Sequence, residues 1–286
     1  MARTPAPCRW ISFQDALNAF VQNVSGHQGS GHIKPLHWYV ACRLVLEGGF
    51  RPDDITPRPP FEIRPRGSRL SLEHVPESGR AGERTILGGL KTKNVDVVVT
   101  KNGIGPVLAV SMKGTLNAFR NLTNRMEEAV GDCTNLHISY PALVYGFLQV
   151  MRANRASEGV APNDIAICQN GTIADTISRY HDIMARLSGR DDVRSETTRY
   201  EAVALVLADT EPSRAGEVVE SFPPEGSPLC VRGFFESLYR QYDQRFVYAA
   251  PGLESVTRRL AWAAESPAFA GGVPVDFRPR LDLAVT

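Results

Sequence analysis

Three charged side chains lie close together in the sequence, where two apolar runs are followed by a helical pattern. Asp96 lies near the start of the first run, Lys113 ends the second, and Glu127 lies in the segment after it. Two carboxylates beside a lysine form the hard oxygen site that Mg²⁺ prefers. Such a site suits a metal-dependent attack on a phosphodiester, with the lysine orienting water or neutralising the phosphate. The alternative is a structural Asp–Lys ion pair at the end of a sheet.

The two apolar runs are predicted to form the strands that position Asp96 and Lys113. Residues 95–100 and 107–113 are rich in valine, and the Asn-Gly and Gly-Pro pairs between them indicate a tight turn. Side chains alternate along a strand, so Ser111 and Lys113 share a face. Antiparallel pairing therefore places Asp96 near Ser111 or Lys113. A neighbouring lysine is expected to keep this aspartate ionised.

The segment after Lys113 has the periodicity of a helix with one apolar face. Its apolar residues recur at helical spacing between 119 and 130. At about 100° per residue, Glu127 lies at the edge of this apolar stripe, while Glu128 points nearly opposite. We therefore expect Glu127 to face the strand ends and Glu128 to face solvent.

The hairpin, the lysine and the helix together resemble the PD-(D/E)xK nuclease superfamily, which includes most type II restriction endonucleases. Asp96 matches the first half of its motif, with a valine before it in place of proline. Ser111-Met112-Lys113 matches the second half, with serine in place of the acid. One subgroup carries this Ser-x-Lys and takes the missing acid from the following helix. Thirteen residues separate Lys113 from Glu127, as in that subgroup.

The resemblance covers residues 83–150 and implies roles for individual residues. Asp96 and Glu127 would bind Mg²⁺, joined by the backbone carbonyl of Met112, and Mn²⁺ would be able to substitute. Lys113 would assist the attacking water. Glu83 is a possible additional acid, for which an ordinary surface glutamate is the alternative.

The resemblance also implies an activity. A type II restriction endonuclease hydrolyses double-stranded DNA at a specific, usually palindromic site and leaves 5′-phosphate ends. It would act as a homodimer, because two-fold symmetry matches a palindrome, and it would be paired with a cognate DNA methyltransferase. Two alternatives stay open: a repair, mobile-element or antiviral effector nuclease of the same fold, and a catalytically inactive DNA-binding module. Ser111 is the residue that favours the inactive module.

Polar and basic residues around the motif are candidate DNA contacts. Their side chains suit phosphates, and asparagine and arginine also suit base edges. The alternative for each asparagine is a helix cap or an exposed helical position. The candidates are Lys91, Lys93, Thr115, Asn117, Arg120, Asn121, Asn124 and Arg125.

The chain as a whole predicts an α/β or α+β protein in which a mixed sheet, like that of restriction endonucleases, is flanked by helices. We expect a single endonuclease domain over 1–286, with its catalytic core at 83–150. A helical segment (1–50) and an irregular basic segment (51–82) precede the core, and an α/β portion (151–286) follows it. Further strands are predicted at 140–150 and 200–207, and helices at 36–46, 173–187 and 234–246.

Composition limits the other possibilities. The five cysteines have no CxxC spacing and no apolar run is long enough to span a bilayer, so we expect a cytoplasmic protein without membrane contact. His32 and His37 lack the HExxH spacing, and the sequence therefore assigns them no metal. The net charge of +1 neither indicates nor excludes a nucleic-acid partner.

Overall fold

A mixed five-stranded sheet forms the centre of the protein. The computed structural model describes residues 11–22 and 30–282. The strand order is β1-β6-β7-β8-β9, with β6 antiparallel to β7 and with β7, β8 and β9 parallel. The strands are β1 (Ile55–Thr56), β6 (Val97–Lys101), β7 (Gly105–Thr115), β8 (Val144–Ala153) and β9 (Ala202–Asp209). The predicted fold class, a mixed sheet flanked by helices, is confirmed.

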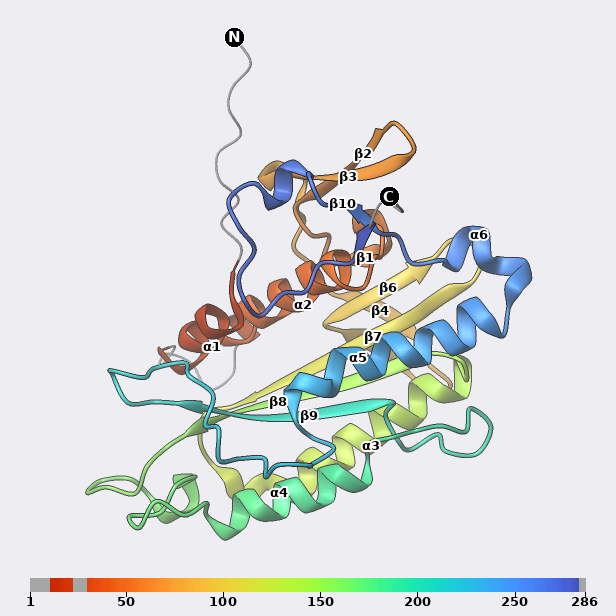
Figure 1. Cartoon of the computed structure of the whole chain (residues 1–286). Helices are drawn as coiled ribbons and strands as arrows, with labels where there is room; N and C mark the ends of the chain where they lie inside the picture. Colours follow the sequence, from red (N-terminus) through yellow and green to blue (C-terminus); the bar gives the residue numbers. More distant parts are fainter. Residues whose placement is uncertain (1–10, 23–29, 283–286) are drawn as a thin grey trace.

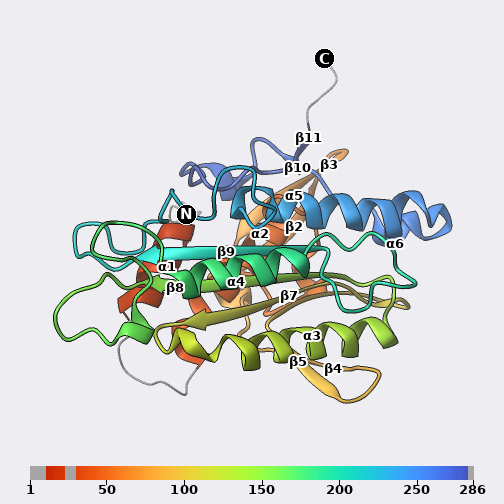
Figure 2. The same cartoon turned by 90° about the horizontal axis from the view of Figure 1, so that it is seen from below.

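Helices cover both faces of this sheet, as Figures 1 and 2 show. One core contains apolar residues of α1 (Phe13–Gln22), α2 (Lys34–Leu46) and α5 (Val231–Tyr242), and the other contains those of α3 (Leu122–Ser139) and α4 (Asp175–Arg186). The strands β8 and β9 are almost wholly buried, which explains their continuous apolar sequences. Parallel strands need long crossover connections, and α3 and α4 provide them.

The segment 51–82 is a correction to the sequence-based prediction. It contains β1 and a hairpin of β2 (Phe61–Arg66) and β3 (Arg69–His74), and is therefore not irregular. Phe61 and Leu72 are buried, and the Leu72 N–H donates to Ser266 Oγ at 3.1 Å. The partner that covers this hairpin comes from the other end of the chain, so no local pattern could reveal it.

The remaining elements are short. A second hairpin consists of β4 (Arg84–Leu87) and β5 (Thr92–Val95), and a small parallel pair consists of β10 (Trp262–Ala263) and β11 (Leu281–Asp282). The helix α6 spans Glu254–Thr257, and a π-helical turn, Asp243–Tyr248, extends α5. None of the helices in the described ranges is long and apolar enough to cross a membrane. The sheet takes β1 and β9 from outside residues 83–150, so it extends beyond the predicted core.

Candidate functional site

A cavity of about 290 Å³ opens where β5, β6 and β7 meet the N-terminal end of α2. Asp96, Ser111 and Lys113 all line it, as the predicted hairpin pairing requires. The full lining is His32, Ile33, Glu83, Lys93, Asn94, Asp96, Ser111, Met112, Lys113 and Gly114. Most of these residues are polar or charged, so the cavity suits a charged ligand.

Asp96 lies at a bend between β5 and β6, rather than within one continuous strand. Its Oδ2 accepts a hydrogen bond from the Met112 N–H at 2.7 Å, and its Oδ1 lies 3.5 Å from His37 Nε2. Burial raises the pKa of Asp96 above its usual value, although the Met112 N–H and the charges of Lys113 and Lys93 oppose this shift. The carboxylate is thus fixed in position but incompletely neutralised by the protein.

His37 reaches the same point from α2. The residue is 4% exposed, and its Nε2 has no hydrogen-bond partner among the described residues. Burial lowers the pKa of His37 to about 4, with Lys34 lowering it further and Glu83 opposing the shift. The imidazole is therefore neutral at pH 7 and can offer a lone pair. The acids that approach His37 come from other elements, so the spacing of residues around it in the sequence could not reveal them.

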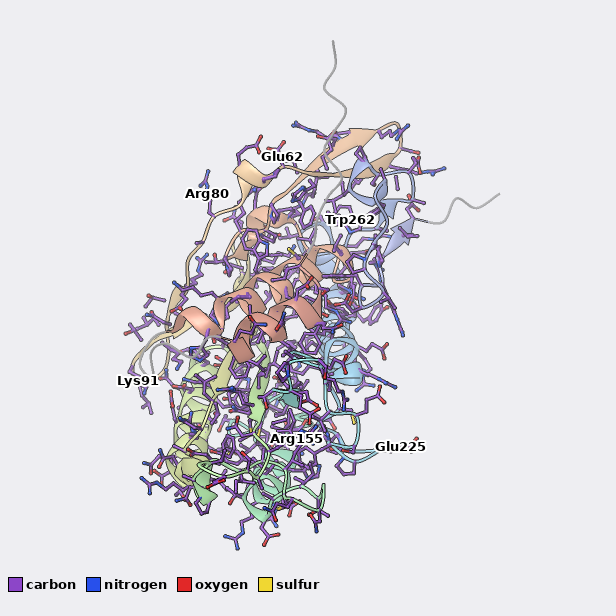
Figure 3. The ribbon with its side chains drawn as sticks, turned by 90° about the vertical axis from the view of Figure 1, so that its left-hand side faces the viewer. Glu62, Arg80, Lys91, Arg155, Glu225 and Trp262 are labelled. Carbon is purple, nitrogen blue, oxygen red and sulfur yellow. The ribbon has the colours of Figure 1, made fainter. Side chains whose placement is uncertain are left out.

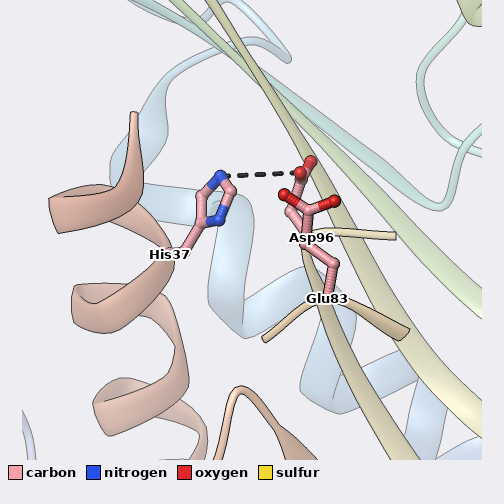
Figure 4. A group of neighbouring side chains, drawn as sticks. All are labelled: His37, Glu83 and Asp96. Atoms are coloured by element: carbon pink, nitrogen blue, oxygen red, sulfur yellow. Dashed lines mark ion pairs between the residues drawn. The ribbon is translucent and has the colours of Figure 1, made fainter. Parts of the chain in front are cut away.

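Glu83 is the third member of this group, shown in Figure 4. It immediately precedes β4, whose Arg84 pairs with Val95 of β5, and this register brings Glu83 alongside Asp96. Ligand atoms of His37, Glu83 and Asp96 lie within 4.8 Å of one another. Metal–ligand distances of about 2.1 Å place neighbouring ligands about 3 Å apart and opposite ones about 4.2 Å apart. Small side-chain rotations would let all three bind one divalent ion.

Lys113 is paired with the exposed Glu128, and not with Glu127, which the sequence predicted to face the strand ends. Lys113 Nζ donates to Glu128 Oε1 at 2.6 Å. Glu127 is exposed and forms no hydrogen bond or ion pair within the described part of the chain. Partial burial would raise the pKa of Glu128, but the hydrogen bond and charge of Lys113 hold it below its usual value.

The β4–β5 hairpin explains why helical periodicity alone did not predict which glutamate of α3 contacts Lys113. Glu128, Asp132 and Asn135 form one row of α3, and this row faces the hairpin, which lies beside α3 in Figure 2. Asp132 is ion-paired with Lys93, and Asn135 Oδ1 accepts the Leu90 N–H at 2.8 Å. Polar contacts thus bury a side of α3 that apolar periodicity assigns to solvent.

The other two residues of the predicted motif have clear structural partners. Ser111 is buried, and its Oγ lies 2.7 Å from the Tyr145 hydroxyl. Met112 lines the cavity with its backbone N–H directed at Asp96, and its side chain is buried. A contact between the Met112 carbonyl and a metal stays a prediction.

The predicted DNA contacts divide into three groups. Thr115 is buried and its hydroxyl accepts a hydrogen bond from Gln149 at 3.0 Å, so it is not a surface donor. Lys93 lines the cavity but is ion-paired with Asp132, and Lys91 is 67% exposed at the periphery (Figure 3). The remainder are Arg120, Asn121 and Asn124, which are exposed, and Asn117 and Arg125, which are half-buried.

Gly114 lies where two other elements pack closely against β7. A Cβ atom at this position would lie 2.6 Å from Phe20 Cε2 and 2.9 Å from His32 Nε2. The missing side chain therefore lets α1 and the turn before α2 pack against β7. This packing brings His32 to the cavity wall.

Comparison of the chain with protein-family models, curated proteins and solved structures finds no match.

Proposed function

We propose that this protein is a divalent-metal-dependent nuclease that hydrolyses phosphodiester bonds in double-stranded DNA. The observation that carries the proposal is the convergence of Glu83, Asp96 and Lys113 on one cavity from three separate elements. A structural ion pair between Asp96 and Lys113 explains this arrangement poorly. The ion-pair partner of Lys113 is Glu128, and Asp96 faces His37.

Each residue has a distinct part in the proposed reaction. Asp96 and Glu83, with His37 beside them, would hold the cation. A divalent ion bound there supplies a Lewis acid that acidifies water and offsets charge on the phosphate. Lys113 would orient the water and neutralise the phosphate. Glu128 keeps the lysine ammonium at the cavity wall, and the Met112 N–H keeps Asp96 in place.

The more particular activity that we propose is type II restriction. It rests on the resemblance of Asp96 and Ser111-Met112-Lys113 to the nuclease motif. Such an enzyme would cut a specific palindromic site as a homodimer, leave 5′-phosphate ends and be paired with a DNA methyltransferase. A cytoplasmic site of action fits this substrate, and the four described cysteines are free thiols, as in a reducing compartment.

The direct test is digestion of plasmid DNA by purified protein with Mg²⁺, with Mn²⁺ and with chelator. We expect cleavage only with a divalent ion, into discrete fragments that carry 5′-phosphates. Asp96→Asn and Lys113→Ala should each lower the rate by about 10²-fold or more, because each removes charge stabilisation at the reacting phosphate. Glu127→Gln, an exposed neighbour of the site, serves as the control and should cleave normally. Wild-type rates in the first two variants would contradict the proposal.

Two other outcomes separate the alternatives. Smeared products or structure-dependent nicks would favour a repair, mobile-element or antiviral effector nuclease over restriction. Salt-sensitive DNA binding without turnover would favour an inactive binding module. Ser111 is the observation that favours the inactive module. Its buried hydroxyl is hydrogen-bonded to the Tyr145 hydroxyl, at the position where the motif usually has an acid.

A further inference from the structure

We propose that the centre formed by His37, Glu83 and Asp96 selects Mn²⁺ over Mg²⁺, with His37 Nε2 as a direct ligand. The inference deepens the proposed function, because it concerns the cation of the same site. It differs from the sequence-based expectation, in which oxygen atoms alone bind Mg²⁺. Its test measures binding and does not require cleavage.

The imidazole of His37 is buried and lacks a hydrogen-bond partner at Nε2 within the described residues. This nitrogen points towards Asp96 in Figure 4. Leaving a buried polar group unsatisfied is unfavourable, so such a group requires an explanation. A cation between His37 and the two carboxylates would satisfy this nitrogen.

The charges around the cavity also favour a bound cation. Asp96 and Glu83 bring two carboxylates to the imidazole of His37. The two lysines of the cavity wall are already paired with acids of α3: Lys113 with Glu128, and Lys93 with Asp132. In the described structure, no lysine or arginine forms an ion pair with Asp96 or Glu83. A divalent cation would therefore neutralise the two acids without disturbing either lysine.

The donor atoms of the centre favour one kind of divalent ion over another. Mg²⁺ prefers oxygen ligands in near-ideal octahedral geometry and gives up its water reluctantly. Imidazole nitrogen suits transition ions, and affinity for a mixed nitrogen and oxygen site rises from Mn²⁺ along the first transition series. Two hard carboxylates with one imidazole suit Mn²⁺, which accepts both kinds of donor. Replacing one oxygen ligand by His37 thus shifts the preference away from Mg²⁺.

The experiment compares Mn²⁺ and Mg²⁺ binding to the whole protein by calorimetry. It also uses electron spin-echo spectroscopy to detect nitrogen coupled to bound Mn²⁺. We expect Mn²⁺ to bind at least about tenfold more tightly than Mg²⁺, with a clear nitrogen coupling. His37→Gln replaces the nitrogen ligand by an amide oxygen of similar reach. It should abolish the coupling and weaken Mn²⁺ binding by at least about tenfold, and Mg²⁺ binding much less.

His32→Ala is the matched control, because His32 lines the same cavity but lies outside the three-residue group. It should keep both the nitrogen coupling and the Mn²⁺ preference. Circular dichroism and thermal unfolding would check that each variant is folded. If His37→Gln proves unfolded, Asp96→Asn is the second variant, and it should also lose tight Mn²⁺ binding.

The possible results distinguish this inference from the proposed function. Equal affinities for the two ions, or bound Mn²⁺ without nitrogen coupling, would overturn the inference even if DNA is cleaved with Mg²⁺. A nitrogen coupling that survives His37→Gln but disappears in His32→Ala would also overturn it. Tight, nitrogen-coupled Mn²⁺ binding without any DNA cleavage would support the metal site and contradict the nuclease.

Discussion

Two pairs of a buried histidine and a carboxylate in this protein differ in what neutralises the acid. His37 Nε2 lies 3.5 Å from Asp96, and His137 Nε2 lies 3.6 Å from Glu201. Glu201 also accepts hydrogen bonds from two guanidinium groups, those of Arg190 at 2.8 Å and Arg245 at 2.6 Å. Asp96 has no such partner in the described structure, and the additional group beside it is another acid, Glu83.

The pKa values of the two acids show the consequence. Burial favours the protonated form of each. At Glu201 the nearby His137, the charge of Arg245 and the Tyr145 N–H outweigh burial, so its pKa lies below the usual value. At Asp96 burial outweighs the opposing groups, so its pKa lies above the usual value. We infer that the chain neutralises Glu201 itself, whereas the Asp96 centre depends on a cation from solution.

The largest predicted effect on stability concerns Glu201, the acid that the chain neutralises with its own arginines. Glu201→Gln leaves Arg190, which is fully buried, without its counter-charge. Breaking a buried ion pair typically costs about 3–5 kcal/mol, so the free energy of unfolding in denaturant should fall by about this amount. The exposed glutamate Glu217, paired with Arg214, is the control, and Glu217→Gln should change stability by less than about 1 kcal/mol. Similar losses in the two variants would remove the distinction that we draw.

The next effect is a pH dependence that we assign to His37. Its folded-state pKa of about 4 lies below the ordinary value of 6.5, so the unfolded chain binds more protons between these pH values. Stability without metal should therefore fall as pH is lowered from 6.5 to 4, by about 2–3 kcal/mol from this residue. Unfolding curves at several pH values should show a smaller decrease in His37→Gln. An unchanged slope in that variant would show that other groups cause the acid sensitivity.

A smaller effect of opposite sign is predicted for the acid of the centre. Asp96→Asn removes a carboxylate whose pKa is raised by burial. The amide oxygen of the asparagine can still accept a hydrogen bond from the Met112 N–H. Without metal at pH 7, this variant should be more stable than wild type. Stabilisation of the wild type by Mn²⁺ should disappear in the variant. Thermal unfolding with and without Mn²⁺ checks both statements, and a destabilised Asp96→Asn protein would contradict the first.

The smallest effects concern the two adjacent glutamates of α3. Glu128→Gln weakens a half-exposed ion pair with Lys113, which should lower stability by less than about 1 kcal/mol. It should nevertheless slow DNA cleavage, because Lys113 loses the group that positions it. Glu127→Gln should leave both quantities unchanged. If Glu127→Gln slowed DNA cleavage and Glu128→Gln did not, Glu127 would have the role that the sequence assigned to it.

Local patterns were sufficient for part of this site. The alternation of valine and the turn residues between two strands predicted the β6–β7 hairpin, and with it the meeting of Asp96, Ser111 and Lys113 at one cavity. These contacts join residues close in sequence, whose relative positions depend on strand pairing alone. The structure also contains the strands and helices predicted for the sheet and the layers on its faces, because local periodicity in the sequence determines them as well.

The remainder of the site depends on contacts between distant segments. His37 meets Asp96 only because α2 packs beside the sheet, and a histidine in an apolar helix gives no sign of that partner. Glu83 is positioned by the β4–β5 register, and the same hairpin covers the side of α3 that carries Asp132 and Asn135. Helical phase could not choose between the two glutamates without knowing what covers the polar side of the helix.

The central claim is that a cation from solution binds between His37, Glu83 and Asp96. The most direct measurement is anomalous X-ray diffraction from crystals of the protein soaked in MnCl₂. We predict one strong anomalous peak within about 2.3 Å of His37 Nε2 and of a carboxylate oxygen of both Asp96 and Glu83. We predict no peak at His137 and Glu201. A filled manganese site elsewhere, with the three side chains unchanged and without a peak between them, would contradict the account.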